Sequence, residues 1–118
     1  VLPEVLAAIA DGVLVCLLDT YVHVFFSAGE LRQFRALVER VGARRDLDWV
    51  SIDPLVPMGE AATDSVLGIP VPAALVERNR REGVFGLIGR LTYRGGSRSG
   101  SLLGVAHPGA AWLEWLTS

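Results

Sequence analysis

The sequence predicts an α/β fold, in which strands alternate with helices before an antiparallel hairpin near the end of the chain. Three observations lead to this prediction. Residues 13–18 form an unbroken apolar run, with the length of a strand buried on both faces of a sheet. An amphipathic helix at residues 27–41 and a second strand at residues 47–52 follow, completing a parallel βαβ unit. Two later apolar segments flank a glycine- and serine-rich stretch, a pattern typical of a hairpin.

A helix is expected at residues 1–10, ahead of the first strand. Its apolar residues recur at helical spacing, and Pro3 and Glu4 suit the first turn. Asp11 and Gly12 end it, because glycine readily adopts the left-handed conformation that follows many helices.

The single cysteine, Cys16, falls within the apolar run of the first strand. We therefore expect a buried, reduced thiol that has no disulfide partner within the chain. A reduced thiol fits a cytoplasmic location.

The helix at residues 27–41 has the clearest boundaries. Ser27 and Glu30 form an S-x-x-E capping box, in which each side chain pairs with the backbone N–H of the other residue. Gly42 suits the position just after the helix. The apolar face comprises Leu31, Phe34, Leu37, Val38 and Val41.

The second half of the chain begins with residues 55–72, whose prolines and glycines predict a loop or an insertion. A short helix is expected at residues 73–82. The hairpin strands are predicted at residues 84–93 and 102–106, joined by a flexible loop, and residues 110–116 close the chain with an apolar segment.

Composition limits the class of protein. The chain has 118 residues, which is one domain or the C-terminal part of a larger one. Half of it is hydrophobic (51%), so it must bury or share much apolar surface. No segment stays apolar for the ~20 residues of a membrane helix. A net charge of −2 gives no general attraction to nucleic acid, so neither a membrane nor a nucleic acid is an expected partner.

Polar residues follow both predicted strands of the βαβ unit. Asp19, Thr20 and Tyr21 come directly after the first strand, with His23 close behind, and Asp53 ends the second. Ligands of open α/β sheets usually bind at the carboxyl ends of the strands. The sequence therefore indicates these five residues as candidates for facing a ligand.

Each candidate also has a structural interpretation. Asp19 and Asp53 equally suit the turns that follow strands. Tyr21 can pack with its apolar neighbours, which leaves His23 exposed in a loop. His107, in a His-Pro-Gly turn, is a sixth candidate with the turn itself as its alternative role.

Several chemistries find no support in the sequence. The two histidines and one cysteine do not form a ligand set at zinc spacing, so no metal site is expected. No serine lies in a G-x-S-x-G motif, which argues against a nucleophilic hydrolase. Arg90, Arg94 and Arg98 near the hairpin could contact a phosphate, although arginines along a strand are usually solvated.

The order of the predicted elements resembles the C-terminal half of a class I, S-adenosylmethionine-dependent methyltransferase fold. Three segments are also similar to an uncharacterised bacterial family, a domain of unknown function with a methyltransferase-like fold. They are VCLLDT at residues 15–20, SAGELR at residues 27–32 and AHPGAAWLEW at residues 106–115. The family pattern has a histidine where this chain has Asp19, and a histidine and an arginine where this chain has small residues at 109–111.

The resemblance implies a half-Rossmann, three-layer domain with the strand order four-five-seven-six in methyltransferase terms. The strand at residues 13–18 then lies at an edge of the sheet. We expect it to pair with a second copy of the chain or with an N-terminal half, since an open strand edge invites pairing. The glycine loop that binds S-adenosylmethionine follows the first strand of methyltransferases, so this chain alone is not expected to bind that cofactor.

Two functions remain open at this point. In the first, the chain is the C-terminal part of a methyltransferase-like protein, with Asp19, Thr20 and Tyr21 near the acceptor site. Alternatively, it is a non-catalytic interaction or structural module that completes its sheet by oligomerisation, which the loss of the family's histidine and arginine residues favours.

Overall fold

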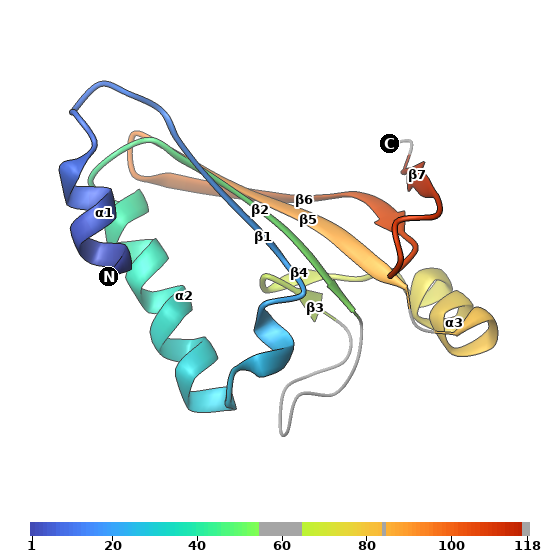
Figure 1. The fold of residues 1–118 in the computed structure, drawn as a ribbon. Coiled ribbons are helices and arrows are strands. Elements are labelled where there is room, and N and C mark those ends of the chain that lie inside the picture. Colours follow the sequence, from blue (N-terminus) through green and yellow to red (C-terminus); the bar gives the residue numbers. More distant parts are fainter. Residues whose placement is uncertain (55–64, 84, 117–118) are drawn as a thin grey trace.

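A computed structural model of the chain describes residues 1–54, 65–83 and 85–116. Five strands form one sheet in the order β1-β2-β5-β6-β7, and β3 and β4 form a separate two-stranded sheet (Figure 1). In chain order the elements are α1 (Leu2–Ala8), β1 (Val15–Thr20), the 3-10 helix η1 (His23–Phe25), α2 (Ala28–Gly42), β2 (Leu47–Pro54), β3 (Ser65–Val66), β4 (Ile69–Pro70), α3 (Ala73–Glu82), β5 (Gly86–Arg94), β6 (Ser97–Ala106) and β7 (Leu113–Trp115).

The predicted βαβ unit is confirmed. β1 and β2 pair in parallel from Val15 opposite Leu47 to Thr20 opposite Ile52, with α2 as the crossover between them. The capping box of α2 is also present. The Ser27 N–H donates to Glu30 Oε2 at 2.7 Å, and the Glu30 N–H donates to Ser27 Oγ at 3.2 Å. This cap fixes the start of α2 just after η1.

The expectation that β1 is buried on both faces is wrong. Its residues alternate between covered and exposed: Val15 is buried, whereas Cys16 is exposed and Leu18 is 65% exposed. The cause is that α1 and α2 both cover the same face of the sheet (Figure 1). Within the described residues the opposite face carries no helix, so the arrangement has two layers and not the predicted three. Cys16 is therefore an exposed thiol.

The predicted order of the hairpin strands is also wrong. The first hairpin strand, β5, pairs with β2, and the second, β6, lies outside it, whereas the four-five-seven-six order places them the other way round. Burial explains the difference. β5 contributes Leu87, Leu91 and Tyr93 to the core, while the first half of β6 is polar and exposed. The more apolar strand takes the more central position.

The hairpin is longer than the sequence predicted, because the predicted loop belongs largely to the strands. β6 begins at Ser97, and only Gly95 and Gly96 form the turn. Both glycines have positive φ, at 55° and 81°, as a two-residue type I′ turn requires. Of the predicted loop at 55–72, residues 55–64 lie outside the described residues, and the rest includes the short β3–β4 hairpin.

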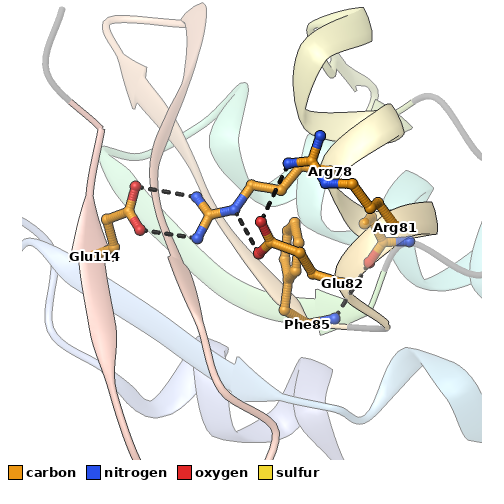
Figure 2. A network of polar contacts seen from close by, with 6 residues as sticks. Arg78, Arg81, Glu82, Phe85 and Glu114 are labelled. Carbon is orange, nitrogen blue, oxygen red and sulfur yellow. Dashed lines mark hydrogen bonds and ion pairs between the residues drawn. The ribbon is translucent and has the colours of Figure 1, made fainter.

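Two arginines attach the outer helices. The Arg45 guanidinium donates to the carbonyls of Leu6 and Ile9, so it holds the end of α1 against the end of α2. Arg78 on α3 donates to both carboxylate oxygens of Glu114 on β7, each at 3.0 Å (Figure 2). Among the described residues, no helix combines the length and apolar character needed to span a membrane.

Candidate functional site

Three of the predicted residues meet at the carboxyl ends of β1 and β2. His23, from η1, lies between two carboxylates: its Nδ1 is 2.7 Å from Asp53 Oδ2, and its Nε2 is 3.4 Å from Asp19 Oδ2. All three side chains are buried or nearly so, and His23 is only 4% exposed. The expectation of an exposed His23 is wrong, and we refer to these three residues as the Asp–His–Asp cluster.

Two side chains of β2 hold the carboxylates in place. Trp49 Nε1 donates to Asp19 Oδ2 at 2.6 Å. The Ser51 hydroxyl lies 2.6 Å from Asp19 Oδ1 and 2.5 Å from Asp53 Oδ2. A hydroxyl has one proton, so Ser51 donates to one carboxylate at a time and bridges the two. The parallel register that sets Asp19 opposite Ser51 explains why these groups meet.

Aromatic rings enclose His23. The ring centroids of Phe26, Phe34 and Trp49 lie 6.0, 5.9 and 5.7 Å from that of His23. Phe26 follows η1, Phe34 comes from α2 and Trp49 from β2. This apolar surround excludes water from the imidazole and strengthens its interaction with the carboxylates.

The cluster stabilises the charged forms of its members. Burial by itself disfavours the imidazolium, but the contacts with Asp19 and Asp53 and their negative charges outweigh it and raise the pKa of His23 to about 9. Burial likewise raises the pKa of Asp19, yet its ion pair with His23 and its hydrogen bonds with Ser51 and Trp49 outweigh this and hold the pKa below its usual value. At neutral pH, His23 is an imidazolium.

Three buried polar atoms at the cluster have no hydrogen-bond partner among the described residues: Tyr21 Oη, His23 Nε2 and Asp53 Oδ1. Nε2 reaches Asp19 within ion-pair distance but outside hydrogen-bond geometry. Burial and the nearby charge of Asp53 raise the pKa of the Tyr21 phenol, so it stays protonated. The cluster therefore retains two donors and one acceptor that the described residues do not use.

Tyr21 reaches this site through an unusual backbone conformation. Its φ is +56°, in the left-handed region that side-chain-bearing residues rarely adopt. The Tyr21 hydroxyl lies over Gly86, where a Cβ would be 2.5 Å from it. A glycine at the start of β5 is thus what allows the phenol to lie at the sheet edge.

The three side chains of the cluster are also of the types that bind metal ions. The ligand atoms of Asp19, His23 and Asp53 all lie within 4.8 Å of one another. However, the two nitrogens of His23 face different carboxylates, and one ion can use only one of them. The short Nδ1–Asp53 contact is that of a hydrogen bond, which favours a proton between these groups.

The residues at this edge do not fit S-adenosylmethionine. That cofactor needs a glycine-rich turn after a strand, whereas β1 leads into η1, and His23, Phe26 and Phe34 fill the space that follows.

The remaining candidates lie apart from the cluster. Thr20 is exposed on the opposite face of β1 from Asp19. His107 lies at the same sheet edge but beyond β6, two strands from β2; its Nδ1 accepts the Gly109 N–H at 2.9 Å and its ring packs near Trp112. The contacts of His107 are therefore those of a turn residue, which is the structural role that the sequence suggested for it.

Sequence reasoning missed Ser51 and Trp49. Both lie inside β2, where a serine or a tryptophan is read simply as part of the strand. Alternation along β2 was the available clue, because Trp49, Ser51 and Asp53 share one face with Asp19 of β1.

Comparison with known proteins adds a family. No curated protein and no solved structure matches the chain. A family described as "Uncharacterized protein conserved in bacteria (DUF2332)" matches residues 1–115. Nearly the whole chain is covered by this match, and the chain belongs to that bacterial family of unknown function.

Proposed function

We propose that this chain is the acceptor-binding part of a methyltransferase-like protein, and that the Asp–His–Asp cluster binds a hydroxyl group of a small polar molecule. The observation that supports this most is that two buried atoms, Asp53 Oδ1 and Tyr21 Oη, have no hydrogen-bond partner among the described residues. A purely structural cluster would satisfy its buried donors and acceptors internally.

A hydroxyl group matches two of the unused atoms, Asp53 Oδ1 and Tyr21 Oη. Its proton can be donated to Asp53 Oδ1. Its oxygen can accept from the Tyr21 phenol, which stays protonated and lies close enough to Asp53 for the carboxylate's charge to raise its pKa. In this arrangement Tyr21 orients the ligand oxygen, and Asp53, held by His23 Nδ1, receives the hydrogen bond that directs the ligand proton.

Phenol and toluene form a matched pair for testing this proposal. They have nearly the same shape, and only phenol has the hydroxyl, so a site built around hydroxyl hydrogen bonds discriminates strongly between them. We expect phenol, but not toluene, to shift the imidazole NMR signals of His23, and we expect Asp53→Asn to abolish the shift. Equal shifts from both compounds, or an undiminished phenol shift in Asp53→Asn, would contradict the proposal.

A second candidate is supported by the edge strand. β1 is the first strand of the sheet order, so one of its edges has no neighbour within the described residues. Val13, Leu14 and Leu18 are all at least half exposed beside it. Open edges with apolar side chains favour strand pairing. We propose that a second copy of the chain pairs along this edge, which would make the chain an interaction module.

The two candidates use different surfaces and are compatible. The cluster lies at the carboxyl end of the covered face, whereas Leu18 lies on the uncovered face. An N-terminal half with a parallel strand would compete for the same edge. If α1 were the right-handed crossover that connects this strand to β1, the strand would lie beside β1, because α1 covers the same face of the sheet as α2.

A further inference from the structure

A polar cavity lies between α2 and the sheet, apart from the Asp–His–Asp cluster. Its volume is about 180 Å³, and Arg35 and Glu39 from α2, Tyr93 from β5 and Arg98 from β6 contribute polar side chains to its lining. Trp49 borders both this cavity and the Asp–His–Asp cluster, because its Nε1 donates to Asp19. The polar side chains of the two sites are otherwise different.

Tyr93 brings an unused donor to the cavity. The residue is 3% exposed, and its hydroxyl has no hydrogen-bond partner among the described residues. Burial raises the pKa of the phenol, so the hydroxyl remains protonated at neutral pH. Its ring packs directly against Gly42 of α2, where any Cβ would overlap it. The glycine therefore leaves room for the ring, and Tyr93 lies in the lining of the cavity.

Arg35 brings a half-buried guanidinium to the cavity. Its Nε is buried and donates to no acceptor, and within the described residues no carboxylate forms an ion pair with the guanidinium. Burial lowers the pKa of Arg35 by more than the nearby charges of Asp53 and Glu39 raise it, since the charged form has lost much of its hydration. A poorly solvated cation of this kind is costly unless an anion approaches it.

Arg98 supplies a second guanidinium at the cavity. It donates to the Leu67 carbonyl at 3.2 Å, and its Nη1 is 3.8 Å from Glu39 Oε1, which is too long for a hydrogen bond. Arg90 and Arg94 are instead bound to Asp48, at 2.9 Å each. Of the three arginines that the sequence suggested for phosphate contact, only Arg98 lines this cavity.

We propose that this cavity binds a small oxyanion group, such as phosphate, through Arg35, Tyr93 and Arg98. Two guanidinium groups outweigh the single carboxylate of Glu39, and the planar donors of arginine match the oxygens of a phosphate. The volume is below the roughly 300 Å³ at which pockets begin to enclose drug-sized molecules, so the cavity suits one such group.

Inorganic phosphate is the probe, titrated calorimetrically into the chain against chloride at equal ionic strength. We expect saturable, millimolar binding of phosphate. Arg35→Gln removes a charge-assisted hydrogen bond and should weaken it about tenfold or more. Tyr93→Phe should weaken it less, because the lost donor is neutral. Glu39→Gln should strengthen binding, since it removes the one carboxylate at the cavity.

Arg32→Gln is the matched control, because Arg32 is an exposed arginine on the same helix. We expect it to leave phosphate binding unchanged. If Arg35→Gln does not fold, phosphate binding is measured with Arg98→Gln instead. Arg98 is partly exposed, so its replacement leaves the core intact. The absence of saturable phosphate binding would overturn the proposal. Binding that is unchanged in Arg98→Gln, and in Arg35→Gln where that variant folds, would also overturn it.

Discussion

His23 Nδ1 donates to Asp53 Oδ2 across 2.7 Å, and this contact joins η1 to the end of β2. The residues belong to separate elements that meet only because β1 and β2 run in parallel. Since Asp19 lies on the other side of the same imidazole, the contact makes His23 a buried cation between two anions.

Stability should therefore depend on pH through His23. Its pKa is about 9 in the folded chain and near 6.5 in the unfolded chain, so the folded state binds the proton more tightly. The contribution to the free energy of unfolding is complete below about pH 6.5 and is lost as the pH rises toward 9. It amounts to a few kcal/mol, on the order of 3. Urea unfolding across this pH range measures it.

His23→Gln should flatten this dependence between pH 6.5 and 9, whereas His107→Gln, at an exposed turn histidine, should preserve it. A parent chain whose stability stays level through this range would contradict the account of His23. At low pH the opposite sign applies to Asp19, whose stabilising contribution is lost as the pH falls through its lowered pKa.

Asp19→Asn should destabilise the fold. The substitution removes one of the two charges that stabilise the His23 imidazolium and one acceptor from Trp49 and Ser51. We expect a loss of about 2–4 kcal/mol, as for breaking a buried charge pair. Chemical denaturation measures it, with Asp11→Asn as an exposed control. Equal stability of both variants would show that Asp19 has no such role.

The sequence predicted the strand ends around the cluster better than it predicted the contacts within the cluster. The two predicted strands end two residues early, because β1 continues through Asp19 to Thr20 and β2 continues through Asp53 to Pro54. The position of His23 could not be predicted, because residue spacing does not reveal that η1 turns the ring back between the two carboxylates. Its aromatic neighbours come from three elements, which only the tertiary fold brings together.

The fold was predictable where local rules decide it. The capping box at Ser27 and the parallel pairing of β1 and β2 follow from motif and connection rules. The number of layers and the order of β5 and β6 were mispredicted, because they depend on which face the helices cover and how burial is shared. An apolar run such as that of β1 looks the same whether a helix or solvent lies over its second face.

Two glycines of α2 should respond in opposite ways to alanine. At Gly42 a Cβ would overlap the Tyr93 ring, so Gly42→Ala should destabilise the fold by about 1–3 kcal/mol. At Gly29 the nearest atoms to a Cβ are 3.9 Å away, so Gly29→Ala should stabilise the helix by up to about 1 kcal/mol. Thermal unfolding compares them, and a stabilising Gly42→Ala would refute the close packing of Tyr93.

The open edge of β1 should produce self-association. Light scattering after size-exclusion chromatography should show a dimer whose fraction rises with protein concentration. Leu18→Lys should shift the chain to monomer, because it places a charge beside the pairing edge. Val5→Lys adds the same charge at another exposed apolar position and should leave the dimer intact. A chain that stays monomeric at all concentrations would contradict pairing between copies.

The pKa of His23, measured by NMR from the pH dependence of its imidazole signals, tests the central feature of the cluster most directly. A pKa near 9 for His23, lowered in both Asp19→Asn and Asp53→Asn, is the expected result. A pKa at or below 6.5 would contradict it, because His23 would then be neutral and could not be held by two carboxylates.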